Sequence, residues 1–551
     1  MDYLNKLDRL LTENLDDGSN PAKILDSVLY KLKPWQIVTI SLVCWISLRL
    51  LIKSLICIKN TNWKVALFRT LRKIPFVQRK IQEELDKTVG EMEVELKEQI
   101  GGLAYHQSLP KVGWNKDQVL KEIEKNMDLG KFKAETGALS GTCHKPPNME
   151  RVETMTSAYK LTAFANPLNP DAFPGIRKFE AEVVRMTLNL FHGDDKACGT
   201  MTSGGTESLI MACKAYRGYG KAKRGITKPN IVMSSSGHVG FDKAGHLMHI
   251  DVRHVPMDPK TMHPDLKKFR QAIDSNTIML VASAPQYPHG IMDPIEDIAQ
   301  LGLDYNIPVH VDACLGGFLI TFMEEAGFEI GKFDFQVPGV TSISADTHKF
   351  GYAPKGSSVI MYRSKEYIHY QYYVSADWTG GIFASPTMAG SRSGGLIAAT
   401  WACMVNHGMD GYRESTRKVV STLQFIVKEI RSIKGLRVLG DPRSCIVAFT
   451  SDDFHIFSLA DAMKEKGWLL SCLQYPTCVH LYVIPMHTQE GVKENFLKEL
   501  RSVAATLLTR PKDTKLEGRA AVYGMAQTLP DRGLVDEMAQ QFLDTLYTTK
   551  N

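Results

Sequence analysis

Hydrophobic and polar positions follow two different patterns along this chain, and each pattern predicts its own kind of domain. From residue 196 to about 400, short apolar runs such as TIMLVASA (277–284) and IPVHVDAC (307–314) are separated by segments with helical periodicity, such as PIEDIAQLGLDYN (294–306). Apolar runs without polar alternation are typical of strands buried on both faces, and helices between them form the crossovers of a parallel sheet. We therefore expect an α/β domain that binds ligands beyond the carboxyl ends of its strands.

Past about residue 401 the pattern changes to that of a smaller α+β domain. A long helical segment (414–433) is followed by short apolar runs and two more helical segments. Near the other end of the chain, residues 77–100 place apolar side chains at helical spacing among charges, which predicts a surface or partner helix. The predicted domains are an N-terminal segment (1–33), an anchor (34–58), a basic and helical linker (59–165), a large domain (166–400) and a small domain (401–551).

The anchor is predicted from an uncharged run at residues 34–48, whose apolar character continues to residue 58 with only Arg49 and Lys53 interrupting. A membrane-spanning helix needs roughly 20 mostly apolar residues. An amphipathic interfacial helix or a buried helix is the alternative. Basic residues dominate from 59 to 80, before the next acidic residue, so the positive-inside rule predicts a lumenal N-terminus and a cytosolic C-terminal part.

The composition of the chain argues against some binding partners and indicates the redox state of its cysteines. The 551 residues carry a modest formal net charge of +6, and no basic stripe with interleaved aromatics is visible, so nucleic-acid binding is not expected. Ten cysteines are scattered without C-x-x-C pairs, which predicts reduced thiols, with neither a disulfide framework nor a metal site.

The candidate for covalent chemistry is Lys349, in the segment SISADTHKFGYAPKGSSVIMY (342–362). It follows His348 at the end of a predicted strand. A lysine that forms a Schiff base needs a desolvated pocket in which a lowered pKa leaves part of its amine neutral. We expect this of Lys349, although most lysines are simply solvated.

Asp312 ends a buried apolar strand, where an unpaired carboxylate would be costly, so a cation should face it. The protonated ring nitrogen of pyridoxal 5'-phosphate (PLP) is such a cation. The alternative is that Asp312 only caps the helix that follows.

Two further motifs fit the same cofactor. TSGGTES (202–208) puts Gly204, Gly205 and Thr206 before a helical segment, where backbone N–H groups can hold a phosphate. His238 lies where another strand passes into a helix and can stack on the cofactor ring, although it can equally be a structural histidine. The order of phosphate turn, histidine, aspartate and His-Lys resembles that of fold type I PLP enzymes, which predicts a mostly parallel central sheet.

A closer resemblance is to the sphingosine-1-phosphate lyases. It rests on these segments: NPLNPDAFPGIRKFEAEVVRM (166–186), TSGGTESLIMACKAYR, IPVHVDACLGGFLI, GVTSISADTHKFGYAPKGSS, DWTGGIFASPTMAGSRSGG (377–395) and AVYGMAQTLPDR (521–532).

The resemblance implies a homodimer with its active sites at the subunit interface, anchored in the endoplasmic reticulum membrane. It implies cleavage of a phosphorylated sphingoid base into a long-chain aldehyde and phosphoethanolamine. By position, Lys349 would bind PLP covalently, Asp312 would hold its ring nitrogen and His238 would stack on it. Gly205, Thr206 and His348 would lie near the cofactor phosphate, and Lys355 near the substrate phosphate.

Three positions depart from the family pattern. Ser140, Asn169 and Phe383 stand where the family has Tyr, His and Tyr, and the insert GTCHKPPNME (141–150) follows Ser140. In the family these are polar groups on the substrate-phosphate side of the pocket. We expect intact cofactor binding but weakened turnover or a shifted specificity. An amino-acid decarboxylase and a catalytically impaired regulatory homologue remain as alternatives.

Overall fold

The computed structural model describes Trp45, Arg49 and residues 72–133, 136–146, 148–510 and 532–549. The chain divides into two compact units, one formed by residues 1–129 with 525–551 and the other by residues 130–524. Each unit is considered by itself. The predicted boundary at residue 401 falls inside a helix of the second unit, because helix α15 (Gly394–Arg431) connects its two sheets, with a kink at Gly408, where φ is 64° and ψ is 172°.

In the first unit, helices from both ends of the chain pack together. Helix α5 (Pro75–Gln99), which corresponds to the helix predicted at 77–100, contacts α19 (Arg532–Leu546), and Arg72 forms an ion pair with Glu537. Helix α6 (Lys116–Met127) begins with a capping box in which Asn115 and Gln118 exchange side-chain and backbone hydrogen bonds.

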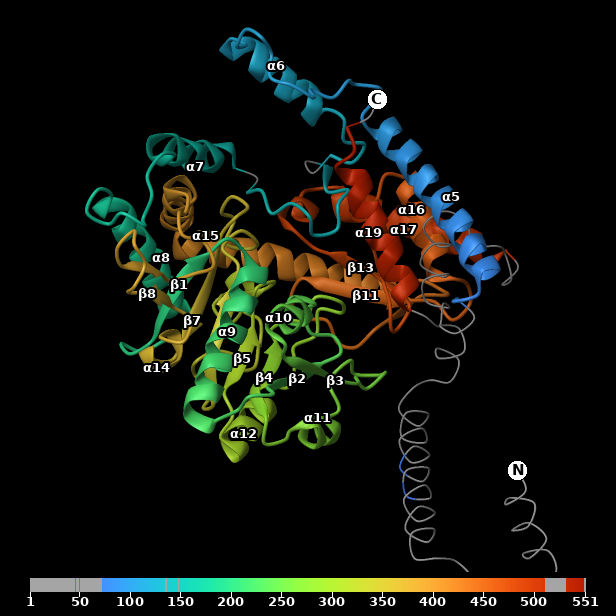
Figure 1. The fold of residues 1–551 in the computed structure, drawn as a ribbon. Helices are drawn as coiled ribbons and strands as arrows, with labels where there is room; N and C mark the ends of the chain where they lie inside the picture. Colours follow the sequence, from blue (N-terminus) through green and yellow to red (C-terminus); the bar gives the residue numbers. More distant parts are fainter. Residues whose placement is uncertain are drawn as a thin grey trace, which may run out of the picture. The chain divides into compact units, whose positions relative to one another are not determined.

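The second unit is built on a mostly parallel seven-stranded sheet with the strand order β1-β7-β6-β5-β4-β2-β3 (Figure 1). The pairs β2–β3, β2–β4, β4–β5 and β5–β6 are parallel, whereas β7 is antiparallel to both neighbours. The strands are β1 (Cys198–Thr202), β2 (Asn230–Ser234), β3 (Asp251–Val255), β4 (Thr277–Ser283), β5 (Val309–Asp312), β6 (Val340–Ala345) and β7 (Ser358–Tyr362). This confirms the predicted α/β class and the buried strands at 277 and 307.

Helices cover both faces of this sheet, as its apolar strands require. Alternate residues of β2 point to opposite faces: Ile231 and Met233 belong to one buried cluster and Val232 to another. The helices are α7 (Met149–Thr162), α8 (Pro174–Leu190), α9 (Gly205–Arg224), α10 (Gly240–Met248), α11 (Leu266–Ala272), α12 (Ile295–Tyr305), α13 (Gly317–Ile320) and α14 (Lys365–Ile368). A two-stranded hairpin of β8 (Tyr373–Ser375) and β9 (Phe383–Ser385) follows α14.

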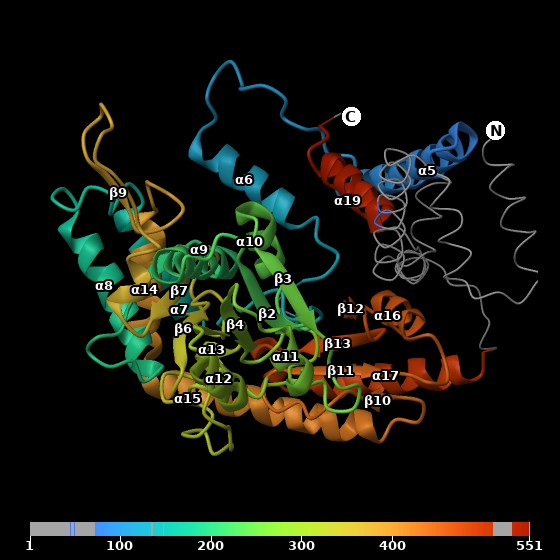
Figure 2. The same cartoon turned by 60° about the horizontal axis from the view of Figure 1, so that its bottom comes forward.

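A smaller antiparallel sheet, β10-β11-β13-β12, forms the C-terminal part of this unit. Its elements are β10 (Arg437–Val438), β11 (Ile446–Thr450), α16 (Ile456–Glu465), β12 (Ser471–Leu473), β13 (Cys478–Tyr482), the 3-10 helix η2 (Pro485–Thr488) and α17 (Val492–Leu508). Helix α15 contacts α8 near the large sheet and β10, β11 and α17 near the small one (Figure 2). One hydrophobic cluster therefore extends from the large sheet into the small one.

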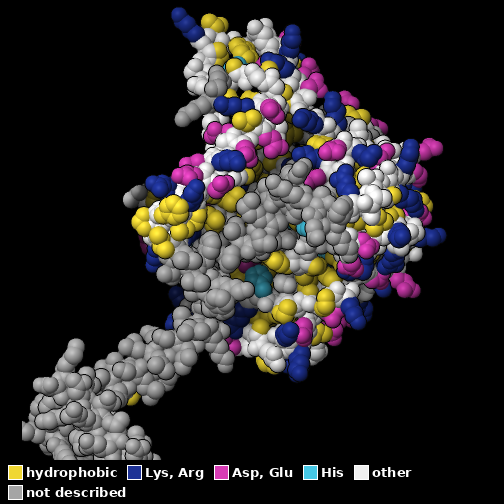
Figure 3. Space-filling model, turned by 90° about the vertical axis from the view of Figure 1, so that its right-hand side faces the viewer, with side chains coloured by type: hydrophobic (Ala, Val, Ile, Leu, Met, Phe, Trp, Pro, Cys, Tyr) yellow, Lys and Arg dark blue, Asp and Glu magenta, His cyan; other side chains and the backbone are white. Residues whose placement is uncertain are grey.

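The predicted anchor at 34–58 lies outside the described residues, apart from Trp45 and Arg49. Within the described part of the chain, no helix combines the length and apolar character that crossing a bilayer requires. Acidic and basic side chains are intermixed among the described residues of the face shown in Figure 3, where no continuous basic stripe is seen.

Candidate active site

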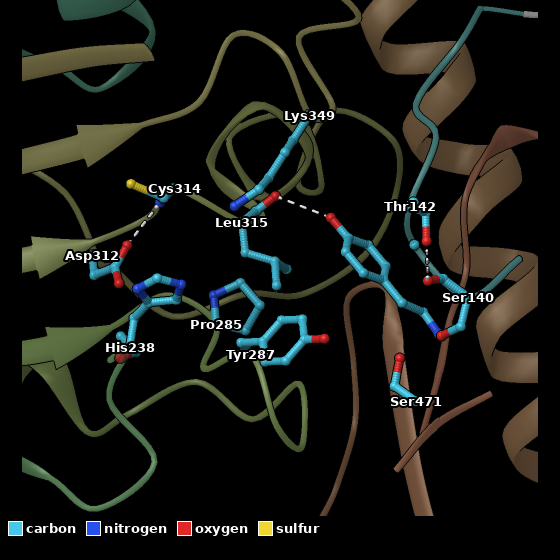
Figure 4. Close-up of a pocket in the computed structure, with 13 residues that line it drawn as sticks. Ser140, Thr142, His238, Pro285, Tyr287, Asp312, Cys314, Leu315, Lys349 and Ser471 are labelled. Carbon is cyan, nitrogen blue, oxygen red and sulfur yellow. Dashed lines mark hydrogen bonds between the residues drawn. The ribbon is translucent and has the colours of Figure 1, made fainter. Parts of the chain in front are cut away.

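A cavity of about 230 Å³ opens where the large sheet faces the small one. His238, Asp312 and Lys349 lie on the wall formed by the large sheet, beyond the carboxyl ends of β2, β5 and β6, and Ser140 and Ser471 lie on the opposite wall (Figure 4). The cavity thus brings together four of the predicted site residues: Ser140, His238, Asp312 and Lys349. They come from segments spread over more than two hundred residues of sequence.

Lys349 is held by a carboxylate. Its Nζ lies 3.0 Å from Oδ2 of Asp346, and the side chains are 24% and 2% exposed. Burial lowers the pKa of Lys349, but the charge of Asp346, aided by Cys314 and Asp312, more than offsets burial, so the pKa is raised. The expected lowered pKa is therefore wrong for this state of the protein, because the sequence argument considered burial and overlooked the acid three residues earlier.

Asp312 is 7% exposed at the end of β5, and its Oδ1 accepts a hydrogen bond from the backbone N–H of Cys314 at 3.0 Å. It therefore caps the turn that follows β5, whereas the helix that the alternative expected it to cap, α13, begins after Gly316 and has no side-chain cap. Capping occupies only one of its oxygens, and the side chain still lines the cavity that contains Lys349. The carboxylate can cap the turn and also face a cationic ring nitrogen.

The predicted phosphate turn begins helix α9, directly behind Lys349. Gly204 has φ 153°, and a Cβ at Gly205 would lie 2.8 Å from Oδ2 of Asp346 and 3.1 Å from Sγ of Cys314. Only glycine fits this close approach. The turn therefore presents the N–H groups of a 20-residue helix beside the Lys349–Asp346 pair, with Thr206 exposed in the first turn.

Histidines and a second lysine surround this turn. His348 accepts a hydrogen bond from the N–H of Ser357 at 3.2 Å and lies 3.5 Å from Oδ2 of Asp346. Lys355 donates to the backbone oxygen of His348 at 3.3 Å. Burial, and then the charge of Lys349, lower the pKa of Lys355. His238 is half-buried and accepts a hydrogen bond from the N–H of Gly240 at 3.0 Å, which fixes the orientation of its ring at the cavity wall.

The three departures from the family pattern lie apart. Ser140 lines the cavity. Phe383 is in the β8–β9 hairpin and packs against Tyr373 and Trp378. Asn169 is exposed in the loop before α8. Neither Asn169 nor Phe383 is among the residues that line the cavity in this chain.

Several residues of the site escaped the sequence analysis. Asp346 could have been found, since it directly follows a predicted strand and lies only three residues before Lys349. Ser283, Cys314 and Tyr482 also line the cavity. Tyr482 is in β13 of the small sheet, and no local pattern connects it with Lys349.

The arrangement fits PLP. A lysine amine, a carboxylate and a histidine share one cavity, and a glycine turn at a helix N-terminus lies next to them. Oδ1 of Asp346 is buried with no hydrogen-bond partner among the described residues. The site therefore contains a hydrogen-bond acceptor that the described protein groups leave unpaired. No cluster of metal-ligating side chains occurs within the described ranges.

Comparison with known proteins agrees with this geometry. The family model described as the pyridoxal-dependent decarboxylase conserved domain matches residues 161–451. A sphingosine-1-phosphate lyase of Drosophila melanogaster is 44% identical over 94% of this chain and 95% of its own length. Sphingosine-1-phosphate lyase 1 of Rattus norvegicus is 45% identical over 98% of this chain and 94% of its own length.

Solved structures show the same fold. A sphingosine-1-phosphate lyase of Burkholderia pseudomallei superposes with a TM-score of 0.74 at 37% identity, covering 81% of this chain and 98% of that protein. A glutamate decarboxylase of Lactobacillus brevis superposes with a TM-score of 0.62 at 22% identity, covering 74% of this chain and 97% of that one. The second likeness is evidence for the fold alone.

Proposed function

The chain belongs to the sphingosine-1-phosphate lyase family, and we propose that it is a PLP-dependent lyase that cleaves the C2–C3 bond of sphingosine 1-phosphate or a related phosphorylated sphingoid base. The products are a long-chain aldehyde and phosphoethanolamine. The observation that carries the proposal is the convergence of Lys349, Asp312 and His238 on one cavity beside the glycine turn of α9.

Each residue has a defined task. Lys349 would supply the amine that holds the cofactor's aldehyde carbon, and Asp312 would pair with its ring nitrogen. His238 would lie against its ring, and the N–H groups after Gly204 would hold its phosphate, with His348 nearby. When bound, PLP withdraws electrons from the carbon that carries the substrate amine. In the balanced reaction the C3 hydroxyl loses a proton, the C2–C3 bond breaks and C2 gains a proton.

Lys355 and the three positions that differ from the family pattern affect recognition of the substrate phosphate. Lys355 lies next to His348, where its cation can attract the phosphate of the substrate. Weakened turnover or a shifted specificity remains part of the proposal, because Asn169 and Phe383 replace side chains that can donate to an anion. Purified protein that matches the rate of a relative with all three family residues would contradict this part.

A silent regulatory homologue is not favoured, because the cofactor residues are all present and lie together. A decarboxylase is not favoured either, since the full-length relatives are lyases. The test is incubation of purified protein with PLP and sphingosine 1-phosphate. We expect both products, and a cofactor absorbance band that disappears, together with activity, in Lys349→Ala. Release of carbon dioxide from an amino acid without aldehyde formation from the lipid would overturn the proposal.

We also propose a homodimer, anchored in the endoplasmic reticulum membrane with its catalytic part in the cytosol. In support, Trp378 and Ile382 of the β8–β9 hairpin are 57% and 82% exposed, so this hairpin offers apolar side chains that a partner subunit can cover. Phe383 also lies on this hairpin, away from the cavity of its own chain. Light scattering should give twice the chain mass, and less for Trp378→Ser with Ile382→Ser. Deletion of residues 1–58 should release the protein from membranes.

A further inference from the structure

Ser140 cannot offer its hydroxyl to a ligand in this arrangement, although it lines the cavity. Its Oγ donates to the backbone oxygen of His480 at 3.2 Å and accepts from the backbone N–H of Tyr482 at 2.9 Å. The residue is 8% exposed. The hydroxyl therefore joins the segment 136–146 to strand β13, and its one proton is already used.

Tyr482 takes the place beside it. A Cβ at Gly141, which has φ +68°, would lie 2.0 Å from Cδ1 of Tyr482, so the ring lies directly on the Gly141 backbone. Any other residue at 141 would push the ring away. Tyr482 is 3% exposed and lines the same cavity as Lys349 and Asp312. Tyr482, in β13 of the small sheet, thus places its phenol on the cavity wall opposite the predicted cofactor residues.

The hydroxyl of Tyr482 is held by a histidine. It lies 2.9 Å from Nε2 of His144 and 3.4 Å from the backbone oxygen of Leu315. Burial, followed by the charges of Lys355, Lys349 and His348, keeps the pKa of His144 well below its usual value, so its ring is neutral. Nδ1 of His144 has no partner among the described residues. In the tautomer protonated at Nε2, His144 donates to the phenol oxygen, and the phenol proton is left with the distant Leu315 oxygen.

Burial also raises the pKa of Tyr482 well above its usual value, so the phenol keeps the proton that it can donate. An anionic oxygen is a far better acceptor than a carbonyl oxygen at 3.4 Å. The cations that act on His144, Lys355 and Lys349, make this end of the cavity attractive to an anion.

We propose that Tyr482 donates a hydrogen bond to the phosphate group of the substrate, and that His144 is a positioning residue that orients the phenol. The proposal rests on the function proposed above. In this proposal β13 contributes Tyr482 to substrate recognition, and the segment around Gly141 supports its ring. None of Ser140, Asn169 and Phe383 provides such a donor. Tyr482 thereby compensates for the donor that Ser140 lacks.

The test is Tyr482→Phe, which removes one oxygen and leaves the ring on Gly141. Calorimetry of the PLP-loaded protein with phosphoethanolamine, and separately with inorganic phosphate, measures the contact without requiring turnover. We expect the affinities for phosphoethanolamine and for inorganic phosphate to fall about tenfold or more, because the substitution removes a hydrogen bond to a charged group. KM for the phosphorylated sphingoid base should rise in parallel, with the cofactor absorbance unchanged.

Tyr216→Phe is the matched control, because Tyr216 is a fully buried tyrosine whose hydroxyl bonds Thr341, and it takes no part in the cavity. It should leave both affinities unchanged. His144→Ala should weaken phosphate binding, whereas His144→Gln, whose amide nitrogen can replace Nε2, should restore most of it.

Unchanged phosphoethanolamine binding in Tyr482→Phe would overturn the inference, as would a lower kcat with unchanged binding. Failure of the proposed lyase activity would be recognised separately, since wild-type protein would then release no aldehyde whatever the outcome of calorimetry.

Discussion

At the scale of single residues, the ion pair between Lys349 and Asp346 controls the protonation state of the amine that is proposed to bind the cofactor. Without a ligand, Asp346 is the nearest counter-charge, and it holds Lys349 protonated beside the glycine turn. Burial would raise the pKa of Asp346, but Lys349 and then His348 outweigh burial and lower it. The pair is thus mutually stabilised, and a neutral amine forms only when this attraction is overcome.

Asp346→Asn keeps the side-chain shape and removes the charge. We expect the pKa of Lys349 to fall, since a nearby opposite charge shifts a pKa by about 1–3 units. The larger neutral fraction should speed association of PLP with the cofactor-free protein by about tenfold or more at pH 7. Stopped-flow absorbance measures this rate.

The matched control for that substitution is Asp334→Asn, because Asp334 is equally buried but pairs with His192 at 2.7 Å, outside the cavity. Its association rate should equal that of the wild type. A rate that Asp346→Asn leaves unchanged would mean that proton release from Lys349 does not limit cofactor binding.

At the scale of elements, the N-terminus of α9 depends on glycine. Gly205→Ala would place its Cβ 2.8 Å from Asp346, so the carboxylate or the helix end must move. Overpacking of this kind costs about 1–3 kcal/mol. We expect lower thermal stability and a higher dissociation constant for PLP, measured by calorimetry and by absorbance titration.

Gly175→Ala is the control for this substitution. Gly175 lies in the first turn of α8, and nothing lies within 4 Å of an added Cβ there. It should be neutral or slightly stabilising, since alanine is the better helix former. An unchanged PLP affinity in Gly205→Ala would show that the helix end can move without affecting the phosphate site.

At the scale of the whole molecule, the second unit buries several histidines in their neutral form. Burial lowers the pKa of each, to about 3 for His310 and His407 and to about 4 for His289, His480 and His487. In the unfolded chain these groups titrate near 6.5. Their stabilising contribution is therefore complete above pH 6.5 and is lost as the pH falls toward 4, because the unfolded state binds more protons.

We expect each of these histidines to cost roughly 2 kcal/mol of stability by pH 5. Asp293 acts in the opposite sense, since burial raises its pKa to about 7, but it is a single group. Denaturant unfolding at pH 8, 6.5 and 5 measures the loss. His310→Asn should reduce the slope of the free energy of unfolding against pH. Replacement of the exposed His246 by Gln should leave that slope unchanged. A stability that stays constant from pH 7 to 5 would contradict neutral burial.

The sequence by itself determined the buried strands and indicated Asp312, His238 and Lys349, which the structure brings to one cavity. Apolar runs without alternation could form only buried strands, and β4 and β5 lie where those runs predicted them. A charged residue at the end of such a strand lies at the sheet edge where ligands bind, as Asp312 does, and Lys349 follows four residues after the end of β6.

Tertiary structure alone decided which residues form the opposite wall of the cavity. Ser140 and Tyr482 are 342 positions apart, and their hydrogen bond exists only because segment 136–146 packs along the small sheet. Local periodicity contains no information about such a contact.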